Sequence, residues 1–181
     1  ELSQGAHKLT LAIADAAAEP HWAKMTVAFS TAPLLRNGGF EELTNEGTPA
    51  GWSCSAWSRK PDTECKFGAG DKAHSGDRSL MVQGIGGSSL NLVCGQQVPL
   101  TPGKTYRLTG YYLQDQGSGH CSIIGGDKGQ YDNSQSLGPM DDWTEFSWEF
   151  TAGDHEKFTL YLRRSGKGTI YYDDIKLEEI Q

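Results

Sequence analysis

Two stretches of the sequence carry side chains of the kind that could bind a hard cation. Asn37-Gly-Gly-Phe-Glu41 places Glu41 directly after a glycine-rich turn, whose carbonyl groups are free to face a ligand. Asp174 lies in Tyr171-Tyr-Asp-Asp-Ile175, within the last strand that the sequence predicts. Calcium prefers oxygen ligands from carboxylates, carbonyls and water. We therefore predict a structural calcium site that joins Glu41 and Asp174. The alternative is that Glu41 only caps a backbone amide and that Asp174 is solvated.

Aromatic and arginine side chains on two predicted strands have the chemistry of a sugar-binding surface. Strand alternation places these four side chains opposite the apolar residues of their strands, and we expect all four to share one face of the domain. They are Arg107, Tyr111, Tyr161 and Arg163. Covering about 60 Å² of a tyrosine ring with a sugar is worth about 1.5 kcal/mol. The sequence therefore predicts glycan binding at Tyr111 and Tyr161; the alternative is that these rings pack under a loop.

The polar stretch 53–72 is predicted to be one long irregular loop, and such loops are often functional. It carries Trp57, which is either a third sugar platform at the rim of the site or a lid over the core. Trp52 and Trp143 fit packing better than ligand binding.

Cysteine usage indicates an oxidising compartment, because the count is even in a glycine-rich, strand-rich chain. The four cysteines form no Cys-x-x-Cys pair, which excludes zinc-ribbon and thioredoxin-like sites. Three pairings are possible. We favour Cys54–Cys65, which would stiffen the loop around Trp57, and Cys94–Cys121, which would join two strands. Four free buried thiols are the alternative.

Catalytic motifs are largely missing from the sequence. The adjacent carboxylate pairs, such as Asp141-Asp142 and Asp173-Asp174, point to opposite faces of a strand, so no such pair can flank one glycosidic bond. No two of the five histidines stand at metal-ligand spacing, and we expect each at the surface. A hydrolytic pair built from two distant carboxylates stays open.

The elements that position these residues are short alternating runs separated by turn signals. Such runs occur at 79–83, 90–100, 105–114, 120–124, 143–151, 157–163 and 169–180. Strands at this spacing are typical of an antiparallel β-sandwich or a barrel, and no long helix is needed after residue 34. The fold class is therefore all-β.

Residues 1–33 differ in character from the remainder of the chain. Alternation in 7–14 and again in 24–29 predicts a β-hairpin, and an amphipathic helix at 10–18 is the competing interpretation. A lone hairpin is marginal in water. It is therefore predicted to be the tail of a preceding β domain or an extra pair of strands on the sandwich. Thr31-Ala-Pro33 is the expected boundary, and the main domain spans 34–181.

Charge and hydropathy restrict the partners and the compartment. The net charge is −7 and no run of lysine or arginine occurs, so we expect no nucleic-acid partner. No apolar run approaches the roughly 18 residues of a membrane span, so we expect no membrane contact. The chain begins at Glu1 without a signal peptide. This predicts a mature or excised part of a larger secreted or cell-surface protein.

An ordered set of motifs resembles the carbohydrate-binding modules of families 4, 9, 16 and 22. The set comprises Leu35-Arg-Asn-Gly-Gly-Phe-Glu-Glu42, Gly51-Trp52, His74-Ser-Gly-Asp-Arg-Ser-Leu80, 96–108, Trp143 and Tyr172-Asp-Asp-Ile-Lys-Leu177. The resemblance covers 34–181 and implies a two-sheet antiparallel β-sandwich of jelly-roll topology. It also implies a structural calcium held by Glu41 and Asp174, with Gly39 and Asp77 contributing carbonyls. Ligands of the family usually lie on the concave sheet, which would carry Tyr111 and Tyr161.

Three functions are compatible with these observations. The first is non-catalytic binding of a polysaccharide or oligosaccharide by an ancillary module of a secreted carbohydrate-active enzyme. The second is a structural sandwich that braces neighbouring domains of the same polypeptide without binding a glycan. The third is a jelly-roll polysaccharide lyase or glycoside hydrolase, because fold does not fix function. We expect the module to be a monomer.

Overall fold

A computed structural model describes residues 6–14, 22–30, 33–58, 65–85, 91–115, 120–127, 130–154 and 157–180. The chain divides into two compact units, Glu1–Pro33 and Leu34–Gln181. Among the described ranges, no helix is long and apolar enough to cross a membrane.

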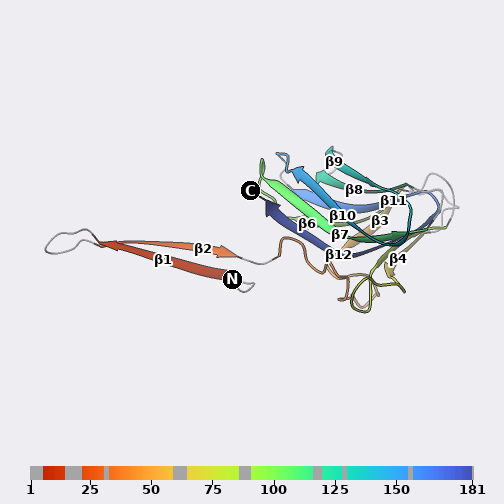
Figure 1. Cartoon of the computed structure of the whole chain (residues 1–181), viewed down its shortest axis with the longest axis horizontal. Helices are drawn as coiled ribbons and strands as arrows, with labels where there is room; N and C mark the ends of the chain where they lie inside the picture. The colour runs from red at the N-terminus through yellow and green to blue at the C-terminus, as the bar shows by residue number, and fades with distance from the viewer. Residues whose placement is uncertain are drawn as a thin grey trace. The chain divides into compact units, whose positions relative to one another are not determined.

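The first unit is a two-stranded antiparallel hairpin of β1 (Ala6–Ala14) and β2 (Trp22–Ser30) (Figure 1). The predicted hairpin is thus confirmed, and the helix proposed for 10–18 is wrong where the structure describes it. Leu11 and Met25 are register partners, and both are exposed. The hairpin's relation to a preceding domain stays a prediction.

The second unit is a sandwich of two five-stranded antiparallel sheets, which confirms the predicted fold class (Figure 1). The first sheet has the order β10-β7-β12-β5-β4 and the second has the order β3-β6-β11-β8-β9. The strands of the first sheet are β4 (Cys65–Ala69), β5 (Leu80–Gly84), β7 (Thr105–Gln114), β10 (Met140–Thr151) and β12 (Gly168–Ile180). Those of the second are β3 (Ser53–Ser58), β6 (Asn91–Val98), β8 (His120–Asp127), β9 (Gln130–Leu137) and β11 (Phe158–Ser165).

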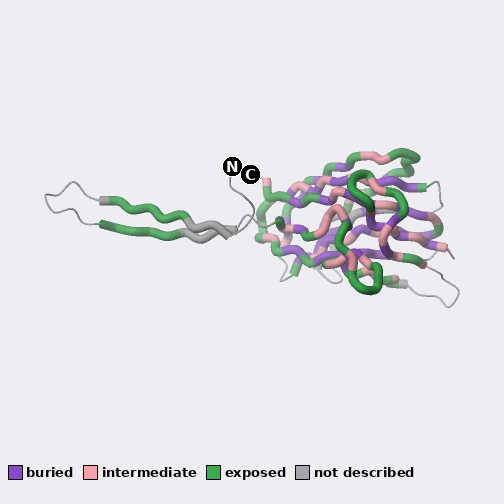
Figure 2. Tube along the Cα trace, turned by 90° about the horizontal axis from the view of Figure 1, so that it is seen from below, coloured by how far each residue is buried: buried purple, intermediate pink, exposed green. Residues whose placement is uncertain are grey.

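The core lies between the two sheets, and alternate residues of strands such as β7 and β11 are buried in it (Figure 2). In β11 the strict alternation sends Leu160 and Leu162 inward and leaves Tyr161 and Arg163 on the outer face. Burying a leucine side chain contributes about 1.5–3 kcal/mol. The inward members are Leu80, Val82, Leu92, Tyr106, Leu108, Tyr112, Phe146, Trp148, Phe150, Phe158, Leu160, Leu162, Ile170, Tyr172 and Leu177.

The long loop predicted for 53–72 is wrong, and a further strand lies between the predicted strands 120–124 and 143–151; all of these additional strands are at the edge of a sheet. The stretch 53–72 holds β3, which pairs with β6, and β4, which pairs with β5. The stretch 125–140 holds β9, which pairs with β8. The described side chains of β3 and β4 are mostly not fully buried, so tertiary pairing rather than hydrophobic alternation defines these two edge strands.

The disulfide links Cys54 of β3 to Cys94 of β6, which are direct register partners, so both predicted pairings are wrong. Cys65 is a free thiol on β4 and lies in the opposite sheet from Cys54. Cys94 and Cys121 flank β11 on either side. Two strand spacings amount to about 9.6 Å, which is beyond the reach of a disulfide.

Candidate functional site

Two aromatic rings meet on the outer face of the second sheet. Trp57 of β3 and Tyr161 of β11 have centroids 5.0 Å apart and planes at 76°, so the rings form a corner. Trp57 lies at the irregularity between Ala56 and Ser58 in the β3–β6 pairing, and it is 39% exposed. Tyr161 lies across from Gly95, where a Cβ atom would come within 2.5 Å of the ring. The glycine therefore allows the tyrosine to lie flat over β6.

Beside the two rings, this face has a buried apolar residue, and hydroxyl and amide side chains surround it. Val93 faces away from the core yet is fully buried, and its register partners are Ser55 and Arg163. Hydroxyl and amide side chains with the same orientation are Ser53, Ser55, Gln97, Ser134, Ser136 and Thr159. We call the outward side chains of this sheet the aromatic face. Rings beside hydroxyl and amide groups match a sugar, which has apolar C–H faces and a rim of hydroxyls.

The two neighbouring arginines of β11 have different environments. Arg163 lies on the aromatic face, where its Nε donates to Asn91 Oδ1 at 2.5 Å. Arg164 points inward and is fully buried, with Asp115 Oδ1 3.6 Å from its Nη2. Asn91 was not anticipated from the sequence, because only the β6–β11 register places it beside Arg163.

Tyr111 and Arg107 lie on the outer face of the other sheet. The prediction that they share a face with Tyr161 and Arg163 is wrong, because β7 and β11 belong to different sheets. His74 stacks on the Tyr111 ring at 3.6 Å between centroids and 11° between planes. This contact is the loop packing that the sequence left open as an alternative. Arg107 is bound by Glu149 at 2.8 Å and Glu178 at 3.4 Å. His74 therefore covers one face of the Tyr111 ring, and two carboxylates neutralise the charge of Arg107.

The two predicted calcium-binding carboxylates both contact one loop, residues 73–78. Glu41 Oε1 accepts from the backbone N–H groups of Asp77 at 2.9 Å and Arg78 at 3.0 Å. Asp174 Oδ1 accepts from Ser75 Oγ at 2.9 Å, and Asp174 Oδ2 lies 2.8 Å from His74 Nδ1. The amide capping that the sequence offered as an alternative for Glu41 is thus present. Among the described residues, no group of three or more His, Cys, Asp or Glu side chains is placed to hold a metal ion.

Backbone strain is concentrated at the same place. Over the described part of the chain, the non-glycine residues with positive φ are Asn37, Phe40 and Asp174, at 49°, 56° and 51°. A backbone hydrogen bond joins the turn at 37–40 to the last strand: the Ile175 N–H donates to Gly38 O at 2.9 Å. Residues in this conformation persist only where the surroundings over-determine them, and they cluster at functional and ligand-binding sites. We call residues 37–42, 73–78 and 173–175 the clasp.

Asp173 stabilises the clasp from inside. It is fully buried, and its carboxylate accepts from the backbone N–H groups of His74, Ser75 and Asp174. Burial raises the pKa of Asp173 above its ordinary value, and these three donors oppose the shift. His74 is exposed, as the sequence predicted, and its ring also links the clasp to Tyr111.

A family model described as a carbohydrate binding domain matches residues 32–166. The chain belongs to this family. The resemblance given by the motifs is confirmed, and non-catalytic glycan binding is the function that the family supports; the brace and the jelly-roll enzyme are not favoured. A search of curated proteins finds no match to the chain.

Solved structures similar to this carbohydrate-binding domain are distant in sequence. A family 61 module in complex with β-1,4-galactotriose is 19% identical with a TM-score of 0.59, covering 82% of this chain and 99% of that one. The CBM22-1 xylan-binding domain of Paenibacillus barcinonensis Xyn10C is 17% identical with a TM-score of 0.53, covering 80% and 92%. The enzymatically active domain of bacteriophage CBA120 tailspike protein 4 is 11% identical with a TM-score of 0.63, covering 82% of this chain but 21% of that one. At these identities the likeness shows the fold.

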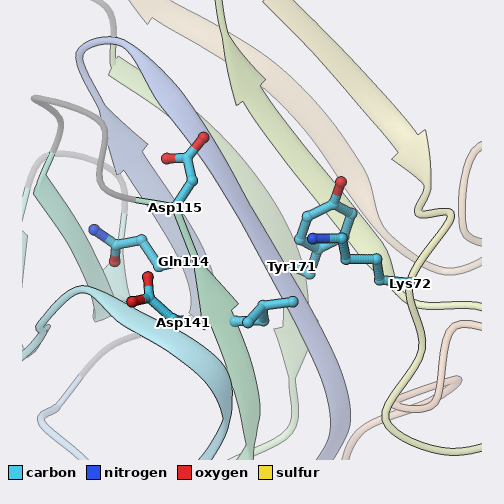
Figure 3. A pocket seen from close by; sticks show the side chains of 6 residues that line it. Lys72, Gln114, Asp115, Asp141 and Tyr171 are labelled. Atoms are coloured by element: carbon cyan, nitrogen blue, oxygen red, sulfur yellow. The ribbon is translucent and has the colours of Figure 1, made fainter.

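A polar pocket of about 200 Å³ lies on the first sheet of the carbohydrate-binding domain (Figure 3). The aromatic face belongs to the other sheet. Its aromatic ring, Tyr171, has the ammonium group of Lys72 5.5 Å from its centroid, and its hydroxyl donates to Asp71 Oδ1. Burial, followed by this hydrogen bond, raises the pKa of Tyr171 to about 12. Asp115 accepts from the Thr169 N–H at 2.8 Å. Because Lys72 covers the ring, the pocket offers a sugar no stacking surface, and the aromatic face is the better candidate.

Proposed function

We propose that this domain binds a polysaccharide or oligosaccharide through the aromatic face, without catalysing its cleavage. The observation that carries the proposal is the Trp57–Tyr161 corner, with ring centroids 5.0 Å apart on an outer sheet face. Each ring that stacks on a pyranose contributes about 1.5 kcal/mol. Two rings with a few hydrogen bonds from the surrounding polar groups give dissociation constants of roughly 10 µM to 1 mM. Tyr111 and Arg107 take no part in this site.

Affinity gel electrophoresis against a panel of soluble polysaccharides tests the proposal. The panel includes a β-1,4-galactan and a xylan, since similar modules bind galactotriose and xylan. We expect at least one polymer to retard the domain, and Trp57→Ala or Tyr161→Ala to reduce the affinity about tenfold. Tyr111→Ala, on the opposite sheet, is the matched aromatic control and should leave retardation unchanged. The proposal fails if no polymer retards the domain or if Tyr111→Ala alone abolishes binding.

The domain is proposed to serve as an ancillary module of a larger secreted or cell-surface protein that acts on carbohydrates. The Cys54–Cys94 disulfide supports an oxidising compartment. The absence of reducing-sugar release from any retarding polymer is expected for the isolated domain. Release of reducing sugar at a rate above that of a heat-treated sample would instead support a lyase or hydrolase.

We also propose that the clasp holds a structural calcium ion. Glu41 and Asp174 would supply carboxylate oxygens, and the backbone carbonyls of the glycine-rich turn at Gly39 and of the loop at Asp77 would complete an oxygen-only set. The support is the convergence of both carboxylates on residues 73–78 and the three left-handed residues there. A bound divalent cation would tie the turn at Glu41 to the last strand at Asp174.

Calorimetry with and without chelator tests the calcium site. EDTA should lower the melting temperature of the wild type, and added calcium, but not magnesium, should restore it. Glu41→Gln should make the melting temperature insensitive to both additions. An unchanged wild-type melting temperature in EDTA, with no calcium found by atomic absorption, would rule the site out.

A further inference from the structure

Arg163 presents a cationic group on the aromatic face. Its position is fixed by β11, two residues beyond Tyr161 on the same side of the strand, which corresponds to a separation of roughly 6.5 Å. Its Nε is occupied by Asn91 Oδ1. The hydrogen bond fixes the side chain through one edge of the guanidinium and leaves the end-on edge, with its two Nη groups, for a ligand.

No carboxylate neutralises Arg163 in the part of the chain that the structure describes, and this separates it from the other arginines of the two sheets. Arg107, its counterpart on the opposite sheet, is bound by both Glu149 and Glu178. Arg164, the next residue, has Asp115 Oδ1 at 3.6 Å. Asn91 satisfies a donor of Arg163 without cancelling its charge.

The surroundings of Arg163 contain no other charge among the described outward side chains of β3, β6, β8, β9 and β11. They are serine, threonine, asparagine, glutamine, valine, isoleucine and the two aromatic residues. The chain as a whole has a net charge of −7. Among its described side chains the aromatic face therefore carries a positive charge, whereas the chain as a whole is negative, and Arg163 attracts an anionic group to this face.

We propose that the aromatic face recognises a glycan with an anionic substituent, either the carboxylate of a uronic acid or a sulfate ester. This inference rests on the glycan binding proposed above and names its substrate class. A pyranose ring stacked on Tyr161 has its ring substituents at its rim, on the scale of the roughly 6.5 Å that separates Tyr161 from Arg163 along the strand. The two Nη groups then bind the oxyanion in a bidentate pair, for which guanidinium geometry is well suited.

The test compares charged polymers with neutral counterparts of the same backbone. One arm pairs polygalacturonate with carboxyl-reduced polygalacturonate, and the other pairs a sulfated galactan with its desulfated form. Titration calorimetry is run on the full chain in 50 mM and 300 mM salt. We expect at least one charged polymer to bind about tenfold or more tightly than its neutral counterpart, with the difference shrinking at high salt. The arm that responds identifies a carboxylate or a sulfate.

Substitutions then assign the preference to this side chain. Arg163→Gln should remove the preference for the charged polymer while retaining the affinity for the neutral one, and Arg163→Lys should keep part of it. Lys176→Gln, an exposed residue of the opposite sheet, removes the same charge and should change neither affinity. Thermal unfolding of each variant confirms that it folds.

The outcomes separate this inference from the proposed function. Equal or tighter binding of the neutral polymers, with loss of affinity on Trp57→Ala, leaves glycan binding in place and overturns the anionic class. A loss of both affinities to the same extent in Arg163→Gln also overturns it. No binding to any charged or neutral polymer, including the galactan and xylan, overturns both.

Discussion

Reduction of the Cys54–Cys94 disulfide should destabilise the sandwich by about 4 kcal/mol. The bridge joins residues 40 positions apart in the sequence. In the chain-entropy account, opening a loop of that length returns about 13 cal/mol/K to the unfolded chain, which is about 4 kcal/mol at 25 °C. The Cys54–Cys65 bridge predicted from the sequence would close a shorter loop and would be worth about 3 kcal/mol. For a domain of this size, the larger value lowers the melting temperature by roughly 8–16 °C.

The bridge also has a local consequence, because β3 is an edge strand whose partner in the sheet order is β6. Trp57 lies three residues after Cys54 on that strand. Loss of the disulfide should therefore loosen the tryptophan side of the aromatic face as well as destabilise the whole fold. We therefore expect the domain to bind its glycan more weakly under reducing conditions, at temperatures where it is still folded.

Urea unfolding followed by tryptophan fluorescence, with and without dithiothreitol, measures the effect. The Cys54→Ala/Cys94→Ala double variant should be less stable and insensitive to the reductant. Cys65→Ser should behave as the wild type in both conditions, because Cys65 is a free thiol. The reasoning is refuted if the reductant costs the wild type less than about 1 kcal/mol, or if peptide mapping finds Cys54 linked to another cysteine.

Three further predictions concern single contacts and the two compact units. Gly95→Ala should reduce glycan affinity without unfolding the domain, because its Cβ would lie 2.5 Å from the Tyr161 ring and displace it; an affinity equal to that of the wild type would contradict the ring position. The pKa of Tyr171 is about 12 in the folded state against an ordinary value of 10.0, so the folded state keeps a proton that the unfolded chain loses. The contribution of this group to the free energy of unfolding is complete below pH 10 and is lost as the pH rises through 12. In Tyr171→Phe, the free energy of unfolding should therefore depend less on pH in that range. A chain of residues 34–181 should unfold at the same temperature as the full chain, since the two units are separately compact; a drop of more than a few degrees in calorimetry would show that the hairpin stabilises the sandwich.

Hydrophobic alternation predicted the central strands of the sandwich and missed strands at its edges. β7 and β11 alternate strictly between inward apolar residues and outward polar or aromatic ones, so their pattern alone identifies them. β3 is rich in serine and has no fully buried side chain among those described, and β3 and β9 each pair with one neighbour. Their strand conformation is imposed by the partner's backbone, and a single sequence carries little signal for that.

The cysteine pairing shows a second limit, since it depends on sheet order as well as on strand positions. The four thiols lie on β3, β4, β6 and β8, and the sequence gives no rule for which of these are neighbours. Short separation favoured Cys54 and Cys65, but the chain crosses from one sheet to the other between them. Once β3 is known to pair with β6, the partner of Cys54 follows from the register.

Two arginines that are equivalent in the sequence pattern show why a binding site cannot be predicted without knowing the order of strands in each sheet. Arg107 and Arg163 occupy the same phase of alternation, each opposite the apolar residues of its strand. β7 lies between β10 and β12, which supply Glu149 and Glu178, whereas β6 supplies Asn91 to β11. One guanidinium is therefore neutralised by its own sheet, and the other keeps its charge beside two aromatic rings. Alternation determines which way a side chain points, but the neighbouring strands determine whether its charge remains available to a ligand.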